Sequence, residues 1–415
     1  MHILIIHQAF ASFDEPGGTR HYEFARLLAA RGDRVTVIAS PVSYITGQKV
    51  SGGEQSWSNE NGVTVLRARV YSAHHKSFYH RIIAFFSFML SSFWIGLGVN
   101  NVDLVWGTSP PIFQGATAWM LARLKGAKFL FEVRDLWPEF AIAVGVLKNP
   151  VVIRLSEWLE RFLYQHADQI IVNSPGFIDH VKTRGGRQVE LIPNGADPEM
   201  FKPTDGGVDF RRAHGFDDKF VALYAGAHGM SNDLDVILDA AKIIQSMTIS
   251  AEELRTLSRQ IQIVLLGDGK EKAALQRRAS EMGLTNLIFL PSVPKNEMPI
   301  VLAGTDACIA ILKRLDEYKT TYPNKVFDYM AAGRPIVLVI DGVIRQVVET
   351  AKCGLFAEPG NAKALANSIY TLASDPEKGR AMGMNGRKYL EENFSREKIA
   401  EKLVNLCENL VRRQG

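Results

Sequence analysis

The chain has 415 residues, of which 47% are hydrophobic and 22% are charged, and its formal net charge is +4 at pH 7. This length exceeds what one small core needs and predicts two or three domains. So small a net charge gives no reason to expect a nucleic-acid partner. The three cysteines are widely spaced and include no CxxC pair, which favours a reducing compartment and argues against a disulfide framework or a cysteine zinc site.

The first half of the chain alternates short apolar runs with helical patterns. Strands are predicted over 3–7, 35–39, 63–68, 103–106, 128–133 and 169–173. Between the first strand and a helix predicted over 21–31 lies the glycine pair Gly17-Gly18. Glycine lets backbone approach a ligand closely, so this loop is a candidate for acceptor or phosphate binding. An ordinary long connection is the alternative, and the pair is not a GxGxxG dinucleotide fingerprint.

A segment without charged residues extends from 82 to 102, and His74, His75, Lys76, His80 and Arg81 precede it. A membrane-spanning helix needs about 20 apolar residues, and serines, glycines and asparagines dilute this run. Basic residues followed by an aromatic-rich helix are also typical of interfacial docking. We favour a domain helix that contacts a membrane through 74–102. A plain core helix and a true span remain as alternatives.

Four charged residues follow the apolar strand residues 129–131: Glu132, Arg134, Asp135 and Glu139. Charges at the carboxyl end of a parallel strand tend to line the ligand site. Asp135 could orient or deprotonate an acceptor hydroxyl, and Arg134 could contact phosphate. An internal Arg–Asp ion pair is the alternative. Two carboxylates can also indicate a glycoside hydrolase, but such an enzyme needs no second nucleotide domain.

The second half of the chain repeats the pattern of strand, glycine loop and helix. Strands are predicted over 220–225, 261–266, 287–290, 307–312 and 336–340, with a helix over 235–244 and a linker at 202–207. The predicted fold is therefore α/β, with two doubly wound Rossmann-like domains that face each other across a cleft. We place the first domain at 1–200 and the second at 201–394. Residues 395–415 form an amphipathic helix expected to pack back on the first domain.

Two loops of the second half are candidates for donor binding. His228 and Gly229 follow the first strand, where the histidine is either a phosphate or sugar contact or an ordinary loop residue. Gly267 opens a tight turn after the next strand, and Lys272 lies one turn into the following helix. This turn is either a plain connection or a contact to base or phosphate.

Residues 322–335 predict a loop, a short helix and a glycine stop followed by proline. Asn324 is a candidate N-cap. The free N–H groups of the helix start and the ammonium of Lys325 together suit a diphosphate, and Asp328 could accept hydrogen bonds from a ribose diol. An ordinary αβ unit with a solvated lysine and aspartate is equally compatible with these residues alone.

Six stretches together resemble the family-4 glycosyltransferases of GT-B architecture, and most closely the bacterial branch that builds O-antigen, capsule and exopolysaccharide. They are spread along the chain in the family's order: 17–18, 132–139, 192–197, 224–229, 267–269 and 323–335. The resemblance implies transfer of a sugar from a nucleotide-sugar, with retained anomeric configuration and without a metal or other cofactor. It places the donor in the second domain and the acceptor in the first.

The chain departs from the family pattern at two places. The family's usual signature has two glutamates eight positions apart, and Asp328 takes the second position while Thr320 stands at the first. The Arg and Lys that usually follow the first strand of the second domain are also absent, with His228 and Asn232 in that region. Lys325 is the candidate replacement for the phosphate-binding charge.

The resemblance also implies partners and a location. A UDP-linked sugar is the favoured donor, and the acceptor is a sugar on a polyprenyl diphosphate or a glycan. The enzyme is expected at the cytoplasmic, inner face of the cytoplasmic membrane. The alternatives are a nucleotide-sugar epimerase or hydrolase of the same fold, and a nucleotide-sugar-binding protein without turnover, which the missing acid at Thr320 would suit.

Overall fold

The computed structural model describes residues 1–15, 17–42, 57–60, 62–71, 78–203, 206–247 and 259–412. The chain forms two compact units. Unit 1 contains Met1–Phe13, Gly17–Pro193 and the C-terminal segment from Glu397. Unit 2 contains Asn194–Arg396 and a short segment that begins at Asp14.

Unit 1 is built on an eight-stranded sheet in the order β3-β4-β2-β1-β5-β6-β7-β8. The strands are β1 (His2–Ile6), β2 (Arg34–Ala39), β3 (Trp57–Glu60), β4 (Val63–Arg67), β5 (Leu104–Ser109), β6 (Lys128–Val133), β7 (Gln169–Val172) and β8 (Val189–Leu191). All neighbours pair in parallel except β3, which is antiparallel to β4. Ile3 in β1 aligns with Val35 in β2 and Leu104 in β5. The central strands are almost wholly apolar because helices cover both faces of the sheet.

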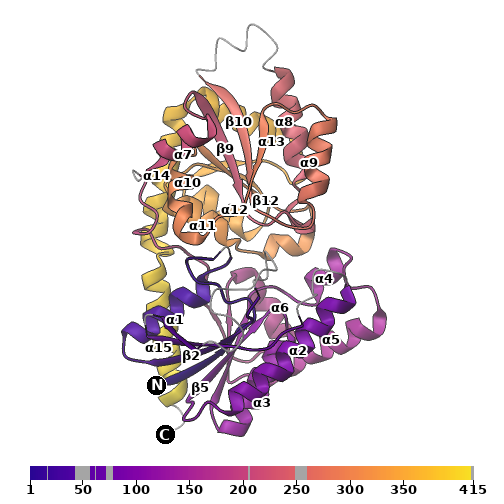
Figure 1. Cartoon of the computed structure of the whole chain (residues 1–415), viewed down its shortest axis with the longest axis vertical. Coiled ribbons are helices and arrows are strands. Elements are labelled where there is room, and N and C mark those ends of the chain that lie inside the picture. Colours follow the sequence, from indigo (N-terminus) through magenta and orange to yellow (C-terminus); the bar gives the residue numbers. More distant parts are fainter. Residues whose placement is uncertain are drawn as a thin grey trace. The chain divides into compact units, whose positions relative to one another are not determined.

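The helices of unit 1 lie on both sides of this sheet (Figure 1). On one side are α1 (Arg20–Ala30) and α15 (Arg396–Arg412), and on the other α2 (Phe78–Leu97), α3 (Phe113–Lys125) and α5 (Pro150–His166). The short helices α4 (Glu139–Ala143), η1 (Pro175–Phe177) and α6 (Ile178–Thr183) complete the unit. Two ion pairs hold α15 on unit 1, Arg31 Nη2 with Glu408 Oε1 at 2.9 Å and Lys402 Nζ with Glu190 Oε1 at 2.6 Å.

The uncharged run from 82 onward forms most of α2. Its inner side includes the buried residues Ala84, Phe88 and Ser92. Across the described ranges, no helix is both long and apolar enough to cross a bilayer, so the span considered for 82–102 is not observed. His74, His75 and Lys76 lie outside the described residues.

Unit 2 is built on a six-stranded parallel sheet in the order β11-β10-β9-β12-β13-β14. The strands are β9 (Lys219–Ala225), β10 (Gln260–Leu266), β11 (Leu287–Leu290), β12 (Ala307–Ile311), β13 (Ile336–Val339) and β14 (Gly354–Phe356). Successive side chains enter opposite cores, with Val221 and Leu223 in one and Ala222 and Tyr224 in the other. The two doubly wound sheets predicted from the sequence are thus confirmed.

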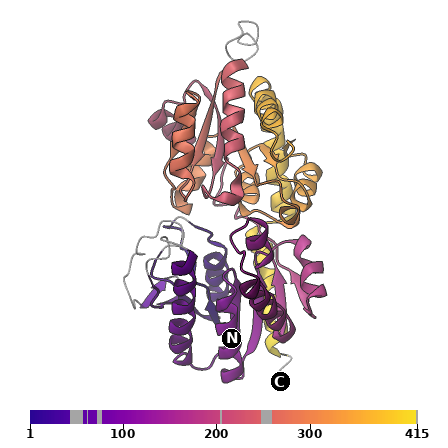
Figure 2. The ribbon, with the colours of Figure 1, turned by 90° about the vertical axis from the view of Figure 1, so that its right-hand side faces the viewer.

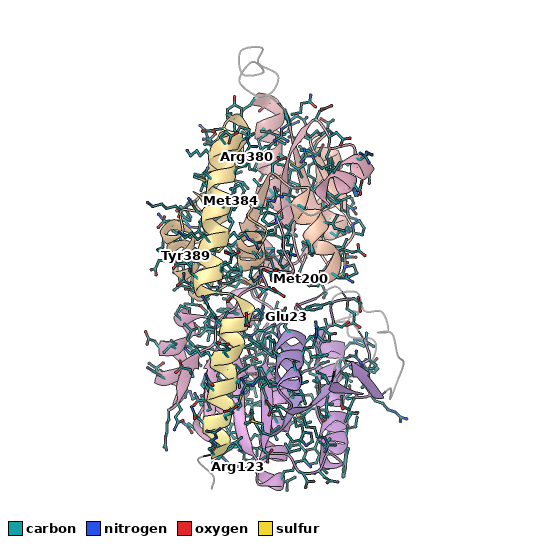
Figure 3. All side chains as sticks on the ribbon, turned by 90° about the vertical axis from the view of Figure 1, so that its left-hand side faces the viewer. Glu23, Arg123, Met200, Arg380, Met384 and Tyr389 are labelled. Carbon is teal, nitrogen blue, oxygen red and sulfur yellow. The ribbon has the colours of Figure 1, made fainter. Side chains whose placement is uncertain are left out.

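Helices cover both faces of this second sheet (Figure 2). They are α7 (Gly207–His214), α8 (Asp235–Met247), α9 (Lys272–Glu281), α10 (Met298–Ala303), α11 (Asn324–Ala331), α12 (Val343–Thr350), α13 (Ala362–Ser374) and α14 (Pro376–Asn393), with the short turns η2 (Met230–Asn232), η4 (Lys295–Glu297) and η5 (Asp316–Thr320). Arg380, Met384 and Tyr389 follow one another along α14 (Figure 3). The loops that follow β9 and β10 meet at the carboxyl edge of the sheet, where an open α/β sheet binds its ligands.

Candidate functional site

In unit 2 the loops after β9 and β10 interlock through their backbones. The backbone N–H of His228 donates to Asp268 O at 2.7 Å, and that of Glu271 donates to His228 O at 3.0 Å. A Cβ on Gly267 would lie 1.9 Å from Gly226 O, and one on Gly269 would lie 2.4 Å from His228 O. Both glycines also have φ near +150°. Only glycine fits here, so these residues serve first to let the two loops cross.

His228 is fully buried within this crossing, and among the described residues neither of its ring nitrogens has a hydrogen-bond partner. Its ring lies between Tyr224 and Phe289, each with a ring centroid 6.1 Å away. Burial, with Lys272 nearby, lowers the pKa of His228 to about 4. The imidazole is therefore neutral at pH 7, with one N–H to donate. An unpaired buried donor is costly unless a ligand completes it.

Lys325 lies in the first turn of α11 and points at the β9 loop. Its Nζ is buried, has no hydrogen-bond partner in the part of the chain that the structure describes, and lies 3.9 Å from the centroid of the Tyr224 ring. A Cβ on Gly226 would be 2.7 Å from this Nζ, so glycine makes room for the amino group. Burial lowers the pKa of Lys325 to about 7. A buried amino group without an anion is a place for a negatively charged ligand.

Lys272, in the first turn of α9, is held by the protein itself. Its Nζ donates to Gly267 O at 2.7 Å and to Leu290 O at 3.3 Å. The side chain therefore fastens the β10 loop to the end of β11. Its predicted contact to base or phosphate stays a prediction.

Asp328 lies one turn beyond Lys325 and forms an ion pair that the sequence did not indicate. Its Oδ2 accepts from Lys295 Nζ at 2.6 Å, and Asn324 Nδ2 is 3.4 Å from the same oxygen. Lys295 is buried, with Nζ 4.9 Å from the centroid of the Phe201 ring. Lys295 follows β11, and this position after the end of a strand was the only feature of the sequence that could have indicated a site residue.

Two further expectations about this region need correction or detail. Pro323 occupies the N-cap of α11 and Asn324 is its first helical residue, so the predicted Asn324 cap is wrong. Thr320 closes η5 and donates from Oγ1 to Glu317 O at 2.6 Å. Asp316, four residues before it, is exposed and pairs with Lys319 at 2.8 Å.

In unit 1 the charged residues after β6 divide into an inward and an outward group. Glu132 is fully buried and accepts from Arg20 Nε at 2.8 Å, His21 Nε2 at 2.6 Å and Trp106 Nε1 at 3.2 Å. Burial alone would raise the pKa of Glu132, but His21 and Arg20 hold it well below its usual range. Burial lowers the pKa of His21 to about 4, so a neutral imidazole donates this hydrogen bond.

In the outward group, Arg134 lies near Gly18. Asp135 is exposed and Arg134 is half-buried. A Cβ on Gly18 would lie 3.8 Å from Arg134 Nη2, and one on Gly17 would lie 2.9 Å from Ala11 Cβ. Within the described ranges the predicted alternative, an Arg134–Asp135 ion pair, is not formed. Glu139 instead pairs with His180 Nδ1 at 2.8 Å.

Chemically, the two groups differ. Unit 2 places a neutral imidazole, a buried amino group and a helix start together, which suits the phosphates of a ligand. Unit 1 places a guanidinium beside a glycine loop, with the exposed Asp135 carboxylate on the next residue, which suits a hydroxylated ligand.

Comparisons with known proteins identify a glycosyltransferase domain in each half of the chain. Residues 17–195 match the Glycosyl transferase 4-like domain, and residues 209–389 match Glycosyl transferases group 1. A protein named as a colanic acid biosynthesis glycosyl transferase, WcaI of Escherichia coli (strain K12), is 24% identical over 399 residues, which cover 92% of this chain and 94% of that one.

Solved structures with the same fold extend over the whole chain. Sucrose-phosphate synthase from Thermosynechococcus elongatus has a TM-score of 0.78 at 18% identity and covers 99% of each chain. Anabaena HepE, solved in complex with UDP-glucose, has a TM-score of 0.72 at 17% identity and covers 99% of this chain and 100% of its own. With both halves matched in order on two parallel sheets, this chain belongs to the bacterial family-4 glycosyltransferases of GT-B architecture.

Proposed function

We propose that the enzyme transfers a sugar from a nucleotide-sugar, with UDP as the favoured nucleotide, to a lipid-linked or glycan acceptor in the synthesis of a bacterial surface polysaccharide. The observation that carries the donor half is the buried, unpartnered Nζ of Lys325 beside Gly226. The name of the relative WcaI supports the polysaccharide, and the UDP-glucose complex of HepE supports the nucleotide.

The donor is assigned to unit 2. Lys325 and the N–H groups at the start of α11 meet the diphosphate, and His228 donates its single N–H to a phosphate or sugar oxygen. Asp328, fixed by Lys295 at 2.6 Å, accepts from the ribose hydroxyls with its other oxygen. The Lys325 ammonium and the N–H groups of α11 and His228 stabilise the charge that develops on the departing diphosphate.

The acceptor is assigned to unit 1. Asp135 orients the acceptor hydroxyl, and Arg134 contacts an acceptor phosphate near Gly17 and Gly18. The acceptor oxygen attacks the anomeric carbon from the face that the diphosphate leaves, so configuration is retained. A donor phosphate oxygen receives the hydroxyl proton.

The acceptor's lipid implies that unit 1 works at a membrane surface. The outer face of α2 exposes Ile83, Phe86, Leu90 and Trp94, which could enter the headgroup region of the inner leaflet. We accordingly place the enzyme at the cytoplasmic face of the inner membrane.

A ligand panel tests the donor first. UDP, GDP, CMP-sialate and NAD are compared by thermal shift, because a ligand that binds only the folded state raises its apparent stability. A shift with UDP alone is expected. A shift with NAD alone would contradict the proposal, and release of the nucleotide from a UDP-sugar without any acceptor would favour a hydrolase.

A further inference from the structure

Helix α5 of unit 1 buries Leu163 and Tyr164 in the core and also leaves three large apolar side chains exposed on its outer side. It buries Glu160 and Ser156, while Val151, Leu155 and Trp158 are 63%, 61% and 61% exposed. Glu160 is retained inside by His180 Nε2 at 2.8 Å, Arg184 Nη1 at 2.6 Å and the Tyr164 hydroxyl at 3.1 Å. The buried carboxylate of this helix has three hydrogen-bond partners, whereas a tryptophan and two aliphatic side chains are exposed. An exposed apolar stripe of this kind indicates a surface that contacts a partner or a membrane.

Helix α2 likewise has an exposed apolar stripe in addition to its apolar inner side, where Ala84 and Phe88 are buried. Its Ser87 and Ser91 hydroxyls face the protein and each accept from a backbone N–H at 2.9 Å, those of Tyr71 and Arg69. The exposed residues Ile83, Phe86, Leu90 and Trp94 recur every three or four positions and form one stripe along the helix. Trp94 is 70% exposed.

The two stripes belong to the same side of unit 1. Helix α3 packs against both α2 and α5, and the three helices gather on one side of the sheet (Figure 1). Aromatic contacts join them, because Phe86 of α2 lies 4.8 Å from Phe113 of α3 between ring centroids. On the other flank, Trp119 of α3 lies 4.7 Å from Phe162 of α5, which stacks on Trp158 at 5.5 Å.

The charged residues around α2, α3 and α5 favour an anionic binding partner. From Gly62 to Phe131 the sequence contains one acid, Asp103, and that carboxylate accepts from the backbone N–H of His2 at 2.6 Å. Arg69 and Arg123 are exposed in the same stretch. On α5, Arg154 and Arg161 are exposed, while its two acids are the half-buried Glu157 and the buried Glu160. Exposed tryptophans flanked by arginines are typical of the membrane–water interface.

We propose that α5 and α2 together form one membrane-binding surface, with Trp158 and Trp94 as its two anchors in an anionic bilayer. This inference rests on the membrane attachment in the proposed function and adds a second helix to it. The outer faces of α2 and α5 lie in the interfacial plane, with their apolar stripes at the acyl boundary and the arginines at the lipid phosphates. Two anchored helices fix the tilt of unit 1 on the membrane, which one helix alone leaves free to rotate about its axis.

The test is vesicle flotation of the full chain with phosphatidylcholine vesicles that do or do not contain phosphatidylglycerol. Leu155→Glu with Trp158→Glu removes the α5 stripe, and Leu90→Glu with Trp94→Glu removes the α2 stripe. The matched control, Val208→Glu with Met384→Glu, places the same charges on residues of unit 2 that are 62% and 55% exposed (Met384 is labelled in Figure 3).

Each stripe variant is expected to lose at least about tenfold in partition onto anionic vesicles, which is about 1.4 kcal/mol. The control variant binds like the wild type. UDP affinity, measured by calorimetry, stays unchanged in all three variants, which separates lost membrane binding from failure of the donor site. An unchanged urea-denaturation midpoint of unit 1, followed by the fluorescence of its remaining tryptophans, separates it from misfolding.

Three outcomes would overturn the inference. Normal flotation of the α5 variant beside a non-binding α2 variant would leave α2 as the sole membrane helix. An equal loss of vesicle binding in the control variant would show that the added negative charge alone, and not the lost apolar stripe, weakens binding. A wild type that ignores vesicles but changes from dimer to monomer on Leu155→Glu with Trp158→Glu would assign the surface to a second copy of the chain.

Discussion

Glu132 in unit 1 and Lys325 in unit 2 are both ionisable groups whose polar atoms are hidden from water, and their surroundings differ in one respect. Glu132 has three donors within 3.2 Å, from Arg20, His21 and Trp106. Lys325 Nζ has an aromatic ring beneath it and no hydrogen-bond acceptor. Burying a charge is costly unless partners compensate it. The buried charge of Glu132 is thus accounted for by its protein partners, whereas the buried amino group of Lys325 is a candidate for binding an anionic ligand.

The largest expected effect tests the first half of this comparison. Glu132→Ala leaves Arg20 buried without its anion, so the free energy of unfolding of unit 1 should fall by ~3–5 kcal/mol. All six tryptophans precede residue 159, so their fluorescence during urea denaturation reports on unit 1. Asp179→Ala, at an exposed acid of α6, is the control. A stability loss no larger than that of the control would show that the network is dispensable.

The next effect concerns the exposed acid beside that network. Asp135→Asn alters the group proposed to orient the acceptor hydroxyl, so turnover should fall by about a hundredfold, the cost of a misplaced reacting group. Donor affinity should remain near that of the wild type, because the donor is assigned to unit 2. Steady-state kinetics and calorimetry with UDP separate these quantities. Preserved turnover with collapsed donor binding would reverse the division of labour.

The second half of the comparison predicts a loss of binding with little loss of stability. Lys325→Ala and Asp328→Ala should each weaken nucleoside-diphosphate binding by ~1.5–3 kcal/mol, the range for hydrogen bonds to charged groups. Lys363→Ala, at an exposed lysine of α13, should leave binding unchanged. Calorimetry decides, and an affinity unchanged in both site variants would remove the central claim about the donor site.

The lowered pKa of Lys325 makes a prediction about pH. With a pKa of about 7 in the free enzyme, the amine is mostly charged below pH 7 and mostly neutral above it. Only the charged form pairs with a diphosphate, so affinity should fall as pH rises above 7, by up to about tenfold per unit. His228 is neutral throughout this range because its pKa is about 4.

Calorimetry in buffers of different ionisation enthalpy should reveal proton uptake on binding above pH 7. Lys325→Arg keeps the charge at all these pH values and should abolish the dependence. An equally pH-dependent Lys325→Arg variant would assign the titration to another group.

The sequence predicted the strands well where they are buried. The apolar run 128–133 became β6 with the same limits, whereas β8 and β14, of three half-buried residues each, are too short to show a period. Helix α5 went unnoticed although Asn149 caps it and Pro150 opens it, because apolar residues on its exposed side and the buried Ser156 and Glu160 obscure the periodic pattern. At the site, Lys325 was found from a local helix start. Lys295 was not, because it pairs with Asp328 across 33 positions through tertiary structure alone.

The last prediction is that removal of divalent metal ions has no effect on turnover. The family resemblance implies that the departing diphosphate is stabilised by protein groups, here Lys325, His228 and the start of α11, and not by a divalent cation. Turnover measured after exhaustive treatment with EDTA should therefore equal turnover in the untreated enzyme. A strict requirement for Mg²⁺ or Mn²⁺ would mean that a metal, and not the uncompensated lysine of unit 2, carries the charge of the leaving group. In that case Lys325→Ala should cost little affinity in the presence of the metal, which the calorimetry above would detect independently.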